Sequence, residues 1–96
     1  MKKYTVTDNG IEVSILAPGV KMENIDINAY DDNRLTVFLP ENKFYYQRKY
    51  AEKFSDMLDV GNSTASLEDG ILTINIPYAE SKKPRRIAIK ELKALE

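Results

Sequence analysis

The sequence predicts an all-β domain built as a sandwich of two antiparallel sheets, with a small barrel as the other option. Three observations carry this prediction. About seven short stretches alternate apolar and polar residues, which is the period of a half-buried strand. Turn-forming Gly, Pro, Asn and Asp residues separate these stretches at short intervals. The chain has 96 residues, which is enough for one core and too few for two.

Composition argues against several classes of chemistry. The chain has no Cys and no His, so it lacks disulfides, thiolate metal sites and the usual general base at neutral pH. We therefore expect no enzyme, no metal and no cofactor. The formal net charge of −1 gives no field to attract nucleic acid or an anionic membrane. Its apolar runs are far shorter than the ~18 residues of a spanning helix, and no signal-type segment starts the chain, so we expect a soluble, cytoplasmic protein.

The first two expected strands form a hairpin. Residues 4–7 alternate and then meet the turn sequence Asp8-Asn9-Gly10, whose last two residues readily take positive φ. The returning arm, residues 11–15, places its three β-branched side chains on one face. Pro18-Gly19 ends this arm.

A second hairpin is expected further along the chain. Residues 21–24 are polar and fit a helical turn or a loop, and residues 25–30 resume the period of a strand. Asp31-Asp32-Asn33 makes the next turn. It lacks the glycine and the bidentate Glu of a calcium loop, so a turn is the better interpretation. Residues 35–39 return as a strand that Pro40 ends.

The next stretch, residues 44–50, is an aromatic strand candidate. Tyrosine is typical of interfaces, because its ring buries apolar area while its hydroxyl keeps a polar partner or water. Residues 51–64 fit neither the strand period nor the helix period well. A short helix or an irregular strand is expected there.

The stretch from Ala65 to Pro77 is the most clearly punctuated. A tight turn at Asp69-Gly70 leads into a strand that places Leu72, Ile74 and Ile76 on one face, and the proline ends it. After Tyr78 the composition becomes polar and basic. We therefore predict a sandwich domain over residues 1–78 and a flexible C-terminal extension over residues 79–96.

These stretches resemble, as an ordered set, the α-crystallin domain of small heat-shock proteins. The resemblance covers roughly Tyr4 to Ile89. It rests on Ala17-Pro18-Gly19-Val20, Ile25-x-Ile27, Asn33-x-Leu35, Ala65-x-x-x-x-Gly70-x-Leu72 and Ile74-x-Ile76-Pro77. The family implies an immunoglobulin-like antiparallel sandwich of about 7–8 short strands. It also implies a stress-response chaperone that holds partly unfolded proteins without ATP.

The resemblance further implies a groove and a tail that fills it. In the family, a groove between the strand matching residues 25–30 and the strand matching residues 71–76 accepts an isoleucine-x-isoleucine tail from a neighbouring subunit. The implied groove residues are Ile25, Ile27, Leu72 and Ile74, and the implied tail motif is Ile87 with Ile89. From the residues alone, the tail motif also fits a last strand of its own domain, or the start of a terminal helix with Leu92 and Leu95 on its apolar face.

A dimer interface is implied by the aromatic stretch. Arg48 resembles the family's arginine on the dimerisation strand, and its neighbours Tyr46 and Tyr50 complete the expected interface. The connection Pro40–Lys43 is too short for the strand-bearing loop that bacterial and plant relatives exchange. We therefore expect a homodimer or small homo-oligomer in which the aromatic strand pairs edge to edge.

Other departures from the family pattern leave alternatives open. The first strand begins almost at Met1, so we expect the long client-binding arm of the family to be missing, and the expected Leu-Pro is replaced near Phe54-Ser55. One alternative is a co-chaperone-type adaptor sandwich. Another is a barrel that binds single-stranded nucleic acid through Lys82, Lys83, Arg85, Arg86, Tyr45, Tyr46 and Tyr50. The leading prediction remains a chaperone whose partners are unfolded proteins, with no nucleic acid and no membrane.

Overall fold

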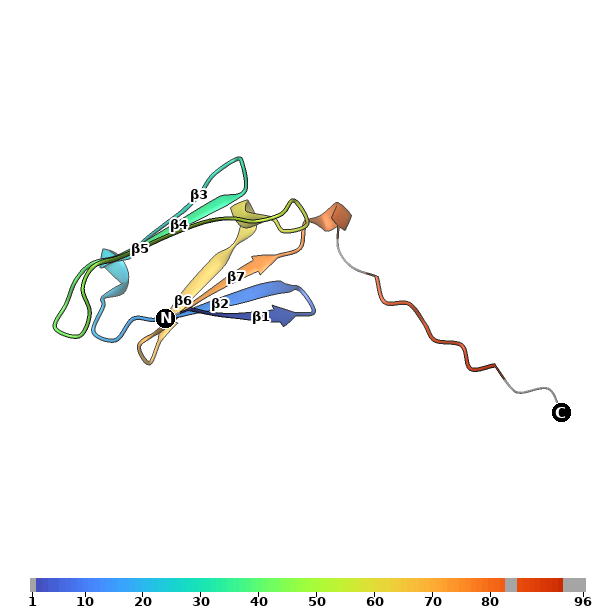
Figure 1. Cartoon of the computed structure of the whole chain (residues 1–96), viewed down its shortest axis with the longest axis horizontal. Helices are drawn as coiled ribbons and strands as arrows, with labels where there is room; N and C mark the ends of the chain where they lie inside the picture. The colour runs from blue at the N-terminus through green and yellow to red at the C-terminus, as the bar shows by residue number, and fades with distance from the viewer. Residues whose placement is uncertain (1, 83–84, 93–96) are drawn as a thin grey trace.

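Two antiparallel sheets face each other in the computed structural model, which describes residues 2–82 and 85–92 (Figure 1). One sheet has the strand order β1-β2-β7-β6 and the other β3-β4-β5. The strands are β1 Lys2–Thr7, β2 Gly10–Leu16, β3 Asp26–Ala29, β4 Arg34–Leu39, β5 Arg48–Lys53, β6 Thr64–Glu68 and β7 Ile71–Pro77. Short 3-10 turns are η1 Met22–Asn24, η2 Val60–Asn62 and η3 Glu80–Lys82. The predicted sandwich is therefore confirmed and the barrel is wrong, since the two sheets remain separate.

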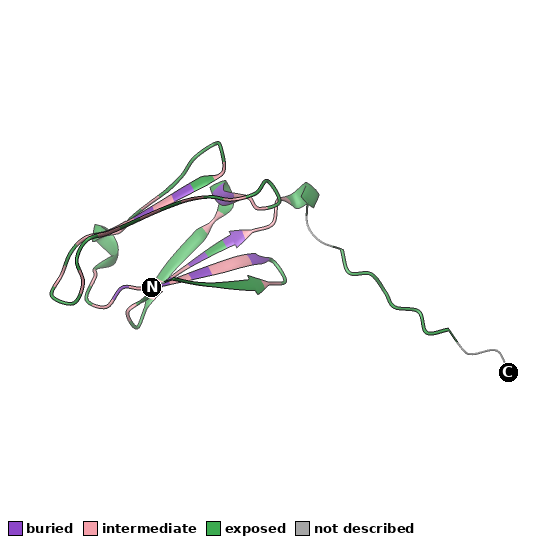
Figure 2. Cartoon of the chain, viewed as in Figure 1, coloured by how far each residue is buried: buried purple, intermediate pink, exposed green. Residues whose placement is uncertain are grey.

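The core lies between β2 and β7 on one side and β4 on the other. β2 and β7 pair so that Val13 faces Ile74 and Ile15 faces Leu72 across the ladder. The alternation read from the sequence thus places these side chains inside, and Figure 2 shows buried positions on the central strands. The buried apolar side chains are Val13, Ile15, Ala17, Leu35, Val37, Leu39, Val60, Leu72, Ile74 and Ile76.

Polar contacts join the edge strand β1 to the opposite sheet. The Lys2 ammonium lies 3.6 Å from the Glu52 carboxylate and 5.0 Å from the centre of the Tyr50 ring. The Tyr4 hydroxyl donates a hydrogen bond to the same carboxylate. The Tyr4 side chain, and after it the Glu52 carboxylate, raise the pKa of Lys2 above its ordinary value despite partial desolvation. Because the Lys2 and Glu52 side chains stay partly exposed to solvent, we expect them to position β1 more than to stabilise the fold.

The aromatic strand predicted over residues 44–50 is partly wrong. β5 begins at Arg48 and continues to Lys53, and residues 44–47 form a loop. The reason is local: the Asn42 side-chain oxygen accepts hydrogen bonds from the N–H groups of Phe44 at 2.8 Å and Tyr45 at 3.1 Å. An Asx side chain that captures these donors competes with a sheet ladder. The first four residues of the predicted strand are therefore held outside the sheet.

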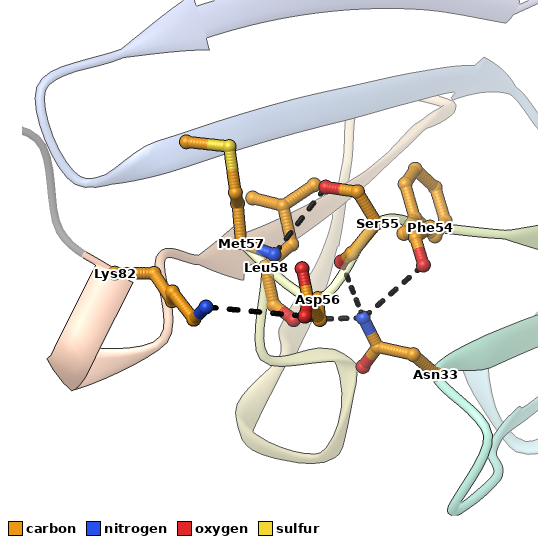
Figure 3. A network of polar contacts seen from close by, with 7 residues as sticks. All are labelled: Asn33, Phe54, Ser55, Asp56, Met57, Leu58 and Lys82. Atoms are coloured by element: carbon orange, nitrogen blue, oxygen red, sulfur yellow. Dashed lines mark hydrogen bonds and ion pairs between the residues drawn. The ribbon is translucent and has the colours of Figure 1, made fainter.

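The unclear region, residues 51–64, contains the end of β5, an isolated bridge between Leu58 and Tyr78, and η2. Asn33 fastens this region to the second hairpin (Figure 3). Its side-chain N–H₂ donates to the carbonyls of Phe54, Ser55 and Leu58 at 3.3, 2.6 and 2.8 Å. Its side-chain oxygen accepts from the N–H of Val60 at 3.1 Å. One amide thus organises a segment in which no regular period is visible.

The C-terminal part of the chain follows η3. Residues 85–92 have no helix or strand and extend away from the sandwich (Figure 1). Lys83 and Leu95, which the sequence assigned to a basic linker and to a possible terminal helix, lie outside the described residues. No helix in the described part of the chain has the length and apolar character needed to cross a bilayer. The domain division at residue 78 stays a prediction.

Candidate functional site

An open groove of about 240 Å³ lies between the β3 side of one sheet and β6 of the other. The apolar alternation around β3 turns Ile25 and Ile27 toward the groove, and Leu72 on β7 is almost fully buried, 2% exposed, so only its edge reaches the groove. β6 provides the second wall as an edge strand that pairs on one side only, with β7. The lining residues are Met22, Ile25, Ile27, Ala65, Ser66, Leu67 and Leu72.

Three of the four predicted groove residues line this groove, and Ile74 does not. Ile74 is only 1% exposed and belongs to the core, where it pairs with Val13 on one side and Ala65 on the other. β6 therefore lies between Ile74 and the solvent at this edge. The resemblance implied that β7 forms this wall of the groove, and the prediction did not include residues 65–67 of β6. The turn at Asp69-Gly70 was the signal for them, because the arm before a tight turn must pair beside the arm that follows it.

The tail motif lies free of the sandwich. Ile87 is 85% exposed, Ile89 is 96% exposed and Leu92 is 81% exposed. These side chains are among the most exposed large apolar groups of the described residues. Figure 2 colours the extended segment after the sandwich as exposed. In residues 85–92 the motif forms neither a strand of its own domain nor a helix. It is thus presented to solvent as an extended apolar segment.

The predicted dimer residues lie on and before the edge strand β5. Tyr46 stands in the preceding loop and is 87% exposed. Arg48 is half-buried, donates from Nη1 to the Leu16 carbonyl at 2.5 Å and stacks on the Tyr45 ring at 4.4 Å. Its Nε and Nη2 are buried and have no hydrogen-bond partner among the described residues. Tyr50 is partly buried and packs against the core, and its role in a dimer interface stays a prediction.

Comparison with known proteins decides the family. The family model described as the Hsp20/alpha crystallin family matches residues 3–90, which includes both sheets, the groove and the Ile-x-Ile motif. The chain belongs to this family of small heat-shock proteins. It is a family of chaperones rather than of enzymes. Within residues 2–82 and 85–92, no three His, Cys, Asp or Glu side chains gather as they would around a metal ion.

Relatives of known sequence agree with this assignment. Small heat shock protein C2 of Rickettsia felis is 32% identical over 98 positions, which cover 88% of this chain and 63% of the relative. Small heat shock protein C4 of the same organism is 29% identical and is covered to 61%. The 18 kDa antigen 1 of Mycobacterium avium is 29% identical over 75% of this chain and 56% of the relative. The chain therefore spans about three fifths of the length of these relatives.

Solved structures of the family share the fold. A small heat-shock protein from Xylella fastidiosa superposes with a TM-score of 0.74 at 19% identity and covers 95% of both chains. Heat shock protein 16.0 from Schizosaccharomyces pombe gives a TM-score of 0.68 at 20% identity, over 94% of this chain and 82% of that one. At such identities the likeness shows the sandwich of the small heat-shock proteins and nothing finer.

Proposed function

We propose that the protein is an ATP-independent holdase that binds exposed segments of partly unfolded clients through its apolar groove and its open sheet edges. The observation that carries the proposal is that one chain has both an open apolar groove and an exposed Ile-x-Ile segment. Extended segments dock at a sheet edge by adding main-chain hydrogen bonds, while alternate side chains fill apolar pockets. The groove has both parts: the free edge of β6 and the apolar side chains beside it.

The energetics favour weak, reversible contacts. Burying two isoleucine side chains contributes about 3–6 kcal/mol, and ordering an extended segment takes back several kcal/mol. A single tail or client segment would therefore bind weakly. Several contacts on one tethered assembly add through effective concentration. This combination suits a protein that must capture clients and release them without an energy source.

The direct test is the aggregation of a heated client protein. At one chain per client chain, we expect light scattering to rise more slowly than for the client alone. Ala65→Trp is expected to abolish most of this protection, because Ala65 is exposed and lines the groove. Thr64→Trp is the matched control, since successive strand residues point to opposite faces and Thr64 does not line the groove. Unchanged client scattering with the wild-type chain would show that the protein is not a holdase.

The tail motif is expected to build the assembly. Changing Ile87 and Ile89 together to Gly removes the apolar side chains and should lower the mass of any oligomer measured by light scattering. Changing Lys90 and Glu91 together to Gly is the control, because it makes the same tail more flexible but keeps both isoleucines. An unchanged mass after the isoleucine change would exclude docking of the tail.

A dimer through β5 is expected to depend on Tyr46. Because the strand is an edge strand and this ring is exposed beside it, Tyr46→Ala should raise the dimer dissociation constant about tenfold, or ~1.4 kcal/mol, in sedimentation velocity. Arg48→Ala should also weaken the dimer, but the loss of its bond to Leu16 affects folding too. Tyr30→Ala is the control, an exposed tyrosine beyond β3. A wild-type monomer at all concentrations would contradict this proposal.

A further inference from the structure

Strand β1 forms an open edge of the larger sheet (Figure 1). Within the part of the chain that the structure describes, β1 pairs only with β2, and its residues from Lys2 to Val6 are exposed. The strand contains no proline, and its register with β2 contains no bulge. It therefore lacks two of the features by which proteins prevent pairing at a sheet edge. The outer backbone groups of β1 are available to another strand.

The hairpin turn determines which backbone groups of β1 face this open edge. A two-residue turn, Asp8-Asn9, joins β1 to β2, so the residues on either side of it form the first hydrogen-bonded pair of the ladder. Hydrogen-bonded and non-hydrogen-bonded pairs then alternate along the two strands. The N–H and C=O groups of Thr5 therefore point toward β2. Those of Tyr4 and Val6 point away from β2, to the open edge.

The side chains of Tyr4 and Val6 lie on the inner face of the sheet, and Thr5 lies on the outer face, because side chains alternate along a strand. On the inner face, β5 covers only the first half of β1. The Tyr4 hydroxyl donates a hydrogen bond to the Glu52 carboxylate of β5, and the Tyr4 side chain is 45% exposed. Val6, further along the strand, is 76% exposed. The inner side of the open edge thus ends in an apolar side chain that its own chain leaves uncovered.

Few registers allow this edge to pair with a second copy of itself. In a symmetric antiparallel pair, the register must be centred on one residue, because opposite residues then lie on the same face. A register centred on Lys2 or Lys3 places like charges directly opposite each other, which is destabilising. A register centred on Tyr4 places Lys2 opposite Val6. One centred on Val6 places Tyr4 opposite Asp8.

The register centred on Thr5 gives favourable pairs. It places Tyr4 of each copy opposite Val6 of the other, and an aromatic side chain opposite a β-branched one stabilises an antiparallel pair. It also places Lys2 opposite Asp8, so opposite charges meet at both ends of the contact. The backbone groups of Tyr4 and Val6 are the ones that point to the open edge. The same register therefore satisfies the side chains and the main-chain hydrogen bonds.

We propose that two copies of this chain pair edge to edge through β1, antiparallel and with the two-fold axis at Thr5. Each copy's Tyr4 then covers the exposed Val6 of the other, and the two larger sheets become one continuous sheet. The pairing is symmetric and closed, so it gives a dimer. Because β5 covers only the Tyr4 half of β1, the axis places the two copies of β5 over different halves of the paired edge. The contact uses no residue after Asp8 and is therefore distinct from the dimer proposed through Tyr46.

A single introduced thiol tests the register. The chain has no cysteine, so Thr5→Cys can form a disulfide only between two copies. Opposite residues in a non-hydrogen-bonded pair have Cα atoms about 4.5 Å apart, which a disulfide can bridge. Lys3→Cys is the matched control, exposed on the same face, because its two copies would lie about 14 Å apart. Under mild oxidation we expect about fivefold more linked dimer from Thr5→Cys than from Lys3→Cys.

Two results would overturn this register. One is an equal yield of linked dimer from the two chains. The other is found by mixing the two chains: if the disulfide forms mainly between Lys3→Cys and Thr5→Cys, the register is centred on Tyr4 instead. Both positions are exposed, so neither change removes a side chain from the core.

Further changes in the Thr5→Cys chain test the contact itself. Val6→Glu should reduce the dimer yield several-fold, because it places a carboxylate beside the Tyr4 ring of the other copy. Thr64→Glu changes the net charge equally at an exposed position on β6, the far edge of the same sheet, and should leave the yield within about twofold. Equal yields from these two chains would overturn the proposal. Tyr46→Ala should also leave the yield within about twofold; a loss as large as that from Val6→Glu would place the contact at β5 and overturn the proposal.

Discussion

Replacing Gly10 by alanine is expected to destabilise the fold by about 3–5 kcal/mol, because steric overlap adds to backbone strain. A Cβ atom at this position would lie 2.0 Å from the Ile76 carbonyl oxygen and 2.7 Å from the Pro77 Cα, both backbone atoms of β7. The φ of Gly10 is also positive, at 156°. Neither backbone atom can move without breaking the central pair of β2 with β7. In a domain of this size the melting temperature, measured by circular dichroism, should fall by about 12 °C or more.

Gly61→Ala provides the matched control for that experiment. A Cβ there would meet only the Asp59 side chain at 3.6 Å, which is ordinary contact, and the residue is exposed. We expect a change within about 0.5 kcal/mol. If both variants melt at the wild-type temperature, that result would contradict the close approach of the β2 backbone to the β7 backbone at Gly10.

Much of the fold could be predicted because local patterns and tertiary packing agree. The turn Asp8-Asn9-Gly10 and the alternation of Leu72, Ile74 and Ile76 each specify one solution, a tight hairpin and a buried face. The structure places both as expected. The alternating pattern gave a wrong prediction where a side chain outside a stretch decides the structure of that stretch. Asn42 captures two N–H groups and keeps residues 44–47 out of β5, although their composition favours a strand.

The groove was predictable only in part for a related reason. Period two shows which side chains of a strand face inward, but it does not show which strand forms the edge of a sheet. Ile74 fits a groove wall as well as a core position by sequence alone. In the structure Ala65 of β6 pairs beside Ile74 of β7, so β6 forms the edge of the sheet. Ile74 is therefore buried and does not reach the surface. Site residues that depend on strand order therefore need the structure.

Asn33 also has a structural role that the sequence did not reveal. The second large prediction rests on this role. The sequence indicated a turn residue, and its φ of 66° lies in the left-handed region. The sequence did not reveal that its amide reaches Phe54, Ser55, Leu58 and Val60. Removing one partner from partly buried backbone groups costs more than the bond itself contributed, because those groups then stay unsatisfied.

Asn33→Ala is expected to lower the free energy of unfolding by about 3–4 kcal/mol, from the lost hydrogen bonds together with the strain of an L-residue in the left-handed region. Asn33→Gly removes the same bonds without that strain, so it should cost about 1 kcal/mol less. Both variants should lose amide-exchange protection first at the N–H of Val60, which the Asn33 side chain holds directly. Asn28→Ala, at an exposed position on β3, should change stability by less than about 0.5 kcal/mol. Equal denaturation midpoints for Asn33→Ala and Asn28→Ala would mean that the segment after β5 is held by its apolar contacts, chiefly the fully buried Val60, and not by this amide.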